Sequence, residues 1–135
     1  MLFQNRQKAI TNADIVKHNN NDVSFYSISQ AIFNNMRLVS STPHFSDQVM
    51  IEIERNANNM IIGTDREQKV YRKVSEMQLA HHDGNGLLHW IVTDDRNNKF
   101  TAVKLIAPDG MVQIKLISAD NTTQIIHNVC ELPQH

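Results

Sequence analysis

The spacing of apolar residues changes near residue 85, and this change constrains the fold more than any other feature of the chain. Before it, apolar residues recur every three or four positions, as on one face of an α-helix. After it, apolar and polar residues alternate, as in a strand with one buried face. Helices followed by strands are typical of the α+β class, in which the helices cover one face of an antiparallel sheet.

The N-terminal part predicts about three helices between residues 21 and 83. The first helix covers Asn21 to about Arg37, with apolar positions at Phe25, Ile28, Ile32 and Met36. It ends before the segment 40–43, because Pro43 cannot continue a helix. The residues before it, 1–20, are polar and predict an N-terminal arm or a short helix.

Two further helices are expected after this break. The second begins near Ser46 and has Gly63 as its C-terminal stop. The third begins at Thr64, with Glu67 at the position that completes a capping box. It ends before the glycine-containing loop 81–86.

The C-terminal part predicts four strands with short connections. These strands cover Leu87–Thr93, Phe100–Ile106, Met111–Ile117 and Thr123–Val129. Short turns join antiparallel neighbours, and Asn97-Asn98 suits a hairpin turn with positive φ. We therefore expect one α+β domain over residues 21–135, with helices at about 21–83 packed on one face of a 3–4-stranded antiparallel meander at about 87–130.

The alternation in these strands also predicts which side chains face the helices. The expected inner set is Leu88, Trp90, Val92, Val103, Leu105, Val112, Ile114 and Leu116. The opposite face then mixes polar and apolar residues. We interpret a half-apolar sheet face as a surface for a partner.

Charge and composition exclude several classes of function. The net charge of −1 gives no support to nucleic-acid binding. No apolar run reaches the ~18 residues of a membrane span, and the first twenty residues lack the apolar stretch of a signal peptide. A single cysteine, Cys130, excludes an internal disulfide. We expect a protein without a cofactor that acts in the cytoplasm or after delivery into another cell.

A weak metal-ligand cluster lies in the loop before the first predicted strand. His81, His82 and Asp83 carry suitable donors. Adjacent histidines on an extended loop point apart, and no second His or Cys completes a known ligand spacing. An exposed histidine pair without metal is the preferred interpretation.

A second cluster resembles a catalytic motif. His89 and Trp90 lie on a strand, Asp109 follows, and Gln124 precedes Cys130 by six residues. This arrangement resembles the ubiquitin-like-protein-specific cysteine peptidases and related bacterial effector enzymes. The resemblance implies that Asp109, or as a second choice Asp94, orients His89, that His89 activates the Cys130 thiol and that Gln124 forms the oxyanion hole. In that family the nucleophile begins a helix, whereas here Glu131 follows Cys130 directly and Pro133 lies two residues further on.

The preferred hypothesis is a non-catalytic protein-binding domain. We expect a bacterial or phage accessory, immunity or effector-type protein that recognises another protein through the exposed sheet face. The same face or an edge of the sheet could also form a homodimer. The predicted contact residues are His89, Ile91, Phe100, Lys104, Gln113 and Lys115. One alternative is a small cysteine-dependent hydrolase or acyltransferase that uses His89 and Cys130. A second is a structural subunit of a larger assembly.

Overall fold

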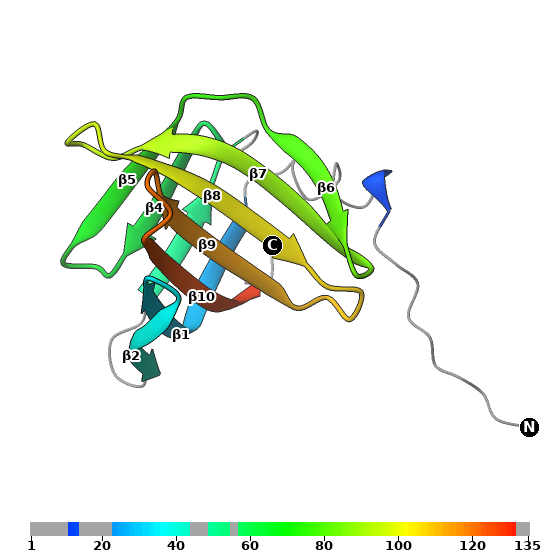
Figure 1. The fold of residues 1–135 in the computed structure, drawn as a ribbon, viewed down its shortest axis with the longest axis horizontal. Coiled ribbons are helices and arrows are strands. Elements are labelled where there is room, and N and C mark those ends of the chain that lie inside the picture. Colours follow the sequence, from blue (N-terminus) through cyan, green and yellow to red (C-terminus); the bar gives the residue numbers. More distant parts are fainter. Residues whose placement is uncertain (1–10, 14–22, 44–48, 55–56, 132–135) are drawn as a thin grey trace, which may run out of the picture.

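The chain folds into β-strands that all belong to one antiparallel sheet (Figure 1). The structure, a computed structural model, describes residues 11–13, 23–43, 49–54 and 57–131. Ten strands form in these residues: β1 (Val23–Asn34), β2 (Arg37–Pro43), β3 (Val49–Ile53), β4 (Asn59–Gly63), β5 (Gln68–Lys73), β6 (Gln78–His82), β7 (Asn85–Thr93), β8 (Lys99–Ile106), β9 (Val112–Ser118) and β10 (Thr123–Glu131).

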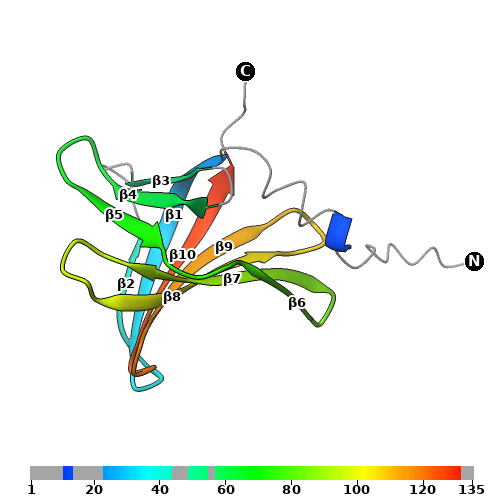
Figure 2. The ribbon, with the colours of Figure 1, turned by 90° about the horizontal axis from the view of Figure 1, so that it is seen from above.

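The sheet closes on itself through β1. Its strand order is β10-β9-β8-β7-β5-β4-β3-β1-β2, and β1 also pairs with β10. The first part of β1 pairs with β3 and its second part pairs with β2, while its other edge follows β10. Strand β6 lies off this ring and pairs with the start of β7. Figure 2 views the strands from above.

The predicted α+β class is wrong, because the described part of residues 21–83 forms six strands and no α-helix. The first expected helix is the β1–β2 hairpin. Asn35 and Met36 form its turn with φ of 51° and 64°, values that reverse the chain between two strands. Phe25 is buried, whereas Ile28 and Met36 are exposed. The three-to-four spacing of these residues therefore does not mark a buried helical stripe.

The second expected helix is the β3–β4 hairpin, and the third covers β5 and β6, which pair with β4 and β7 rather than with each other. Ile51 and Ile53 of β3 are both buried, as alternation in a strand requires. The Thr64 hydroxyl accepts hydrogen bonds from the N–H groups of Arg66 and Glu67, as a helix cap would. Thr64 N–H also donates to the Glu67 carbonyl (2.9 Å). This bond closes the β4–β5 turn. The residue predicted to cap a helix, Thr64, therefore stabilises a turn between two strands instead. The start of the second helix at Ser46 and the arm 1–20, except residues 11–13, lie outside the described residues.

The C-terminal antiparallel strands occur as predicted. Strands β7, β8, β9 and β10 pair in sequence order. Asn97 and Asn121 adopt φ of 61° and 62° in the first and last of their turns. Gly110 in the middle turn has a φ of 89°, which favours glycine.

The core fills the inside of the closed sheet. Its largest fully buried side chains are Trp90, Phe25, Ile51, Met60, Ile106, Ile114, Leu116 and Val92. The predicted inward positions of β7 and β9 are confirmed, since Leu88, Trp90, Val92, Val112, Ile114 and Leu116 are all buried. Those of β8 are wrong: Ala102, Lys104 and Ile106 are buried, and Val103 and Leu105 face outward.

The β9–β10 turn should make the protein sensitive to acid at one carboxylate. The Ser118 hydroxyl and the Thr122 backbone and side chain donate to Asp120 Oδ1 and lower the Asp120 pKa to about 2. A folded pKa below the unfolded value of 3.8 means that this stabilisation is complete above pH 3.8 and is lost as the pH falls toward 2. We expect carboxyl NMR to give this pKa and Asp120→Asn to remove this part of the acid sensitivity. A value near 4 would contradict the turn geometry.

Candidate functional site

The interior of the sheet contains a small group of polar side chains. Ser27, Lys104 and His127 are the buried polar or charged residues among those described. Ser27 Oγ lies 2.8 Å from His127 Nδ1. Lys104 Nζ lies 5.3 Å from the centre of the Phe25 ring, within the range of a cation–π contact. Trp90 Nε1 is buried with no hydrogen-bond partner among the described residues.

The serine–histidine distance suits a nucleophile and its base, but the burial does not. Ser27 is 5% exposed and His127 is 4% exposed, so a substrate has no route to the hydroxyl unless the sheet opens. We interpret the pair as a side-chain bond between the neighbouring strands β1 and β10, next to the irregularity in their register at Ser27–Ser29. Nothing in the sequence indicates it, because 100 positions separate the two residues.

The predicted contact residues divide between the two sides of the sheet. His89, Gln113 and Lys115 lie partly exposed on the outer face, and Ile91 is 40% exposed. Lys104 faces the interior, between Leu88 and Ile114 in the register. The Phe100 ring meets the Tyr71 ring edge to face, with centroids 5.8 Å apart.

The outer face of β7, β8 and β9 is rich in partly exposed apolar side chains. The register places His89, Val103 and Lys115 in one row across the three strands, and Ile91, Thr101 and Ile117 in the next. A third row contains Leu87, Leu105 and Gln113. Gln113 Nε2 donates to Asn128 Oδ1 (2.9 Å) on β10, so polar contacts fix one corner of this face.

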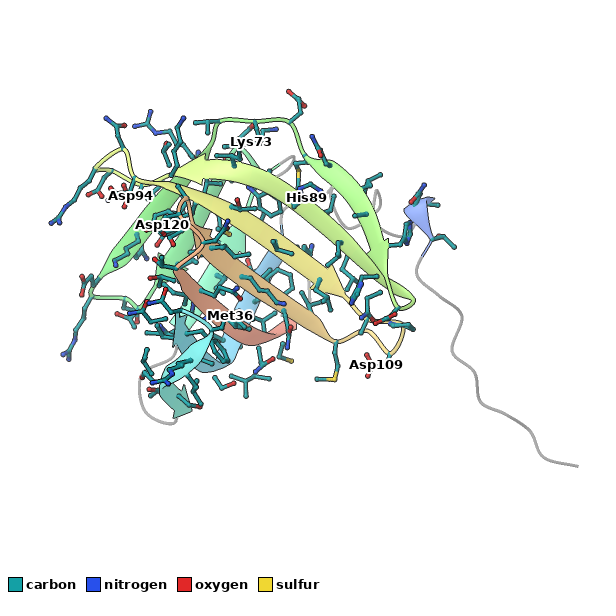
Figure 3. All side chains as sticks on the ribbon, in the orientation of Figure 1. Met36, Lys73, His89, Asp94, Asp109 and Asp120 are labelled. Atoms are coloured by element: carbon teal, nitrogen blue, oxygen red, sulfur yellow. The ribbon has the colours of Figure 1, made fainter. Side chains whose placement is uncertain are left out.

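The residues of the alternative cysteine site lie far apart. His89 and Cys130 are on strands three places apart, roughly 14 Å at ~4.8 Å per strand. Gln124 and Cys130 stand at opposite ends of β10. Asp109 lies in the β8–β9 turn, where its carboxylate accepts from Met111 N–H (3.0 Å). Figure 3 shows Asp109 at one end of the molecule and His89 further along the sheet. The structure therefore does not assemble these groups.

His81 and His82 are the last residues of strand β6 rather than part of a loop, and Asp83 follows them in the turn. His82 Nε2 lies 3.2 Å from Asp83 Oδ2, and both side chains are largely exposed. His81 Nε2 lies 2.6 Å from Asn12 Oδ1. Within the described ranges, no three His, Cys, Asp or Glu residues come close enough to hold a metal ion.

A cleft of about 590 Å³ opens where β5 diverges from the β7–β8 hairpin. Its lining is Glu67, Gln68, Lys69, Val70, Asp94, Asp95, Arg96 and Asn98. In Figure 2 the β4–β5 end of the sheet and the β7–β8 hairpin point apart on this side. The sequence does not indicate this cleft, because β5 was predicted as part of a helix and so had no strand edge.

The electrostatics of the cleft follow from its carboxylates. Burial raises the pKa of Tyr71, and the carboxylates of Asp94 and Asp95 raise it further. Desolvation acts to raise the pKa of Asp94, but hydrogen bonds from the backbone and side chain of Asn98 and from Arg96 N–H lower it. The turn therefore uses the Asp94 carboxylate, and Asp95 is the other carboxylate that the β7–β8 hairpin brings to the cleft.

Comparisons with other proteins identify no relative. No family model, curated protein or solved structure matches this chain. In the described part of the chain, no helix is long and apolar enough to span a membrane.

Proposed function

We propose that this protein is a non-catalytic domain that recognises another protein through the outer face of β7, β8 and β9. The observation that supports this is the apolar content of that face. Leu87, Ile91, Val103, Leu105 and Ile117 point outward on three adjacent strands. A closed sheet buries its core on the inside and does not need apolar side chains here. Apolar side chains interspersed with hydrogen-bonding groups on an exposed surface are typical of a protein-binding site.

Four predicted contact residues lie on this surface. Ile91 is the most exposed apolar side chain of this face, and His89, Gln113 and Lys115 provide hydrogen-bonding groups on the same face. Lys104 and Phe100 have no part in this proposal, because one is buried and the other packs against the core. We expect the domain to act in the cytoplasm or after delivery into another cell.

An acidic residue at Ile91 should weaken partner binding by roughly tenfold or more, the effect of losing one well-packed apolar contact. The measurement is the amount of partner captured from the native host by immobilised wild type and by Ile91→Asp, with identification by mass spectrometry. Met36→Asp is the matched control, because Met36 is 89% exposed and lies on the β1–β2 turn, outside the face formed by β7, β8 and β9. Equal capture by Ile91→Asp and the wild type would contradict the proposal.

The same variants distinguish a foreign partner from a second copy of the chain. If the face forms a homodimer, the wild type elutes as a dimer in size-exclusion chromatography and Ile91→Asp elutes as a monomer. A structural subunit would instead form larger species that grow with concentration.

A further inference from the structure

Along β5, the backbone N–H and C=O groups of successive residues point alternately toward β4 and toward β7. Lys73 N–H donates to the Asn58 carbonyl (3.0 Å), and the Glu67 carbonyl accepts from Thr64 N–H (2.9 Å). Odd-numbered residues of this strand therefore bond toward β4. Val74 N–H donates to the Ile91 carbonyl (2.8 Å), so even-numbered residues bond toward β7.

The pairing between β5 and β7 stops before β5 ends. It contains only two residue pairs, Arg72 with Thr93 and Lys73 with Val92. The β4 side of β5 is paired from Gln68 to Arg72. The same register would place Val70 opposite Asp95, but there the chain has already entered the β7–β8 turn. Hence the N–H and C=O groups of Gln68 and Val70 point into the cleft, without a strand partner among the described residues.

We propose that this cleft binds an extended polypeptide segment of a partner, which adds a strand to the free edge of β5. An extended backbone supplies donors and acceptors at the spacing that Gln68 and Val70 require. The cleft, at about 590 Å³, has room for it. The segment carries a lysine or arginine that reaches the Asp95 carboxylate, because Glu67, Asp94 and Asp95 outnumber the cations Lys69 and Arg96 in the lining.

This site is separate from the outer face. It uses backbone groups of β5 and a carboxylate of the hairpin, whereas the outer face uses side chains of β7, β8 and β9. Ile91→Asp should therefore leave the cleft unchanged. The two proposals can fail independently.

Hydrogen exchange followed by NMR tests the free edge first. In the protein alone, the amides of Gln68 and Val70 should exchange at least about tenfold faster than those of Lys69 and Tyr71, which bond toward β4. Equal protection at all four amides would overturn the proposal, because it would mean that the edge is already paired.

Titration with a defined probe then tests the occupant. The probe is a capped six-residue peptide of alternating valine and threonine with one central lysine. We expect it to slow exchange at Gln68 and Val70, and to bind more tightly than a peptide with glutamate in place of lysine. Asp95→Asn should abolish this difference. A probe that is N-methylated at alternate residues should not bind, and binding equal to that of the parent would overturn strand addition.

Val70→Pro removes one N–H group from the cleft and should lower the affinity for the probe about tenfold, since a backbone bond and its alignment are lost. Proline is tolerated where the N–H of a strand faces an unpaired edge. Val70→Thr keeps the N–H and should bind like the wild type, as should Ile91→Asp. If circular dichroism shows that Val70→Pro is unfolded, the N-methylated probe decides the question. Unchanged binding to folded Val70→Pro would overturn the proposal.

Discussion

Replacing Trp90 by alanine should lower the free energy of unfolding by about 3–5 kcal/mol, the usual cost of deleting a large aromatic side chain from a core. Trp90 is 1% exposed and is the largest of the fully buried side chains. It lies on β7, between Leu88 and Val92, which are also buried. No neighbour can fill the space that the indole leaves without moving the strands around it.

Trp90→Phe is the informative control for this variant. The indole Nε1 makes no hydrogen bond within the described residues, so the exchange to phenylalanine loses packing volume but no polar contact. We expect it to cost clearly less than the alanine variant. Urea denaturation followed by far-UV circular dichroism measures both, since the variants lack the only tryptophan. Equal losses for the two variants would contradict the packing argument, because the variants differ in the volume that they remove and not in the loss of the indole N–H.

The C-terminal half of the fold was predictable because each strand there has one buried face and each turn has its own chemistry. Asn97, Gly110 and Asn121 hold the left-handed backbone that the three turns require. The N-terminal half was not predictable from spacing, because apolar residues on both faces of its strands imitate a helical repeat. In β5, for example, Tyr71 is buried while Val70 is exposed.

The site was predictable only in part, for a related reason. His89, Ile91, Gln113 and Lys115 face outward because their strands follow simple alternation. Lys104 breaks the rule that charged residues face water, and hydrophobicity therefore assigned β8 to the wrong side. Only the register shows the true side, since Lys104 pairs with the inward residues Leu88 and Ile114. The cleft depends on where pairing stops, which no local pattern reports.

Aspartate at position 102 should prevent folding or cost several kcal/mol, whereas aspartate at position 103 should cost about 1 kcal/mol or less. Ala102 is fully buried opposite Trp90 and Leu116, so a carboxylate there would be buried without a partner. Val103 is partly exposed on the outer face, where a carboxylate stays hydrated. The two variants add the same charge to neighbouring residues, and they differ only in the side of β8 that receives it.

Soluble yield and urea denaturation of Ala102→Asp and Val103→Asp give opposite results for the two assignments of this strand. If Val103 faced the interior and Ala102 faced outward, as hydrophobicity alone predicts, Val103→Asp would be the variant with the larger loss of stability. Ala102→Ser controls for a polar but uncharged group at the buried position. If Val103→Asp proved the less stable protein, Lys104 would face solvent, and both the interior polar group and the outer face defined here would have to be reassigned.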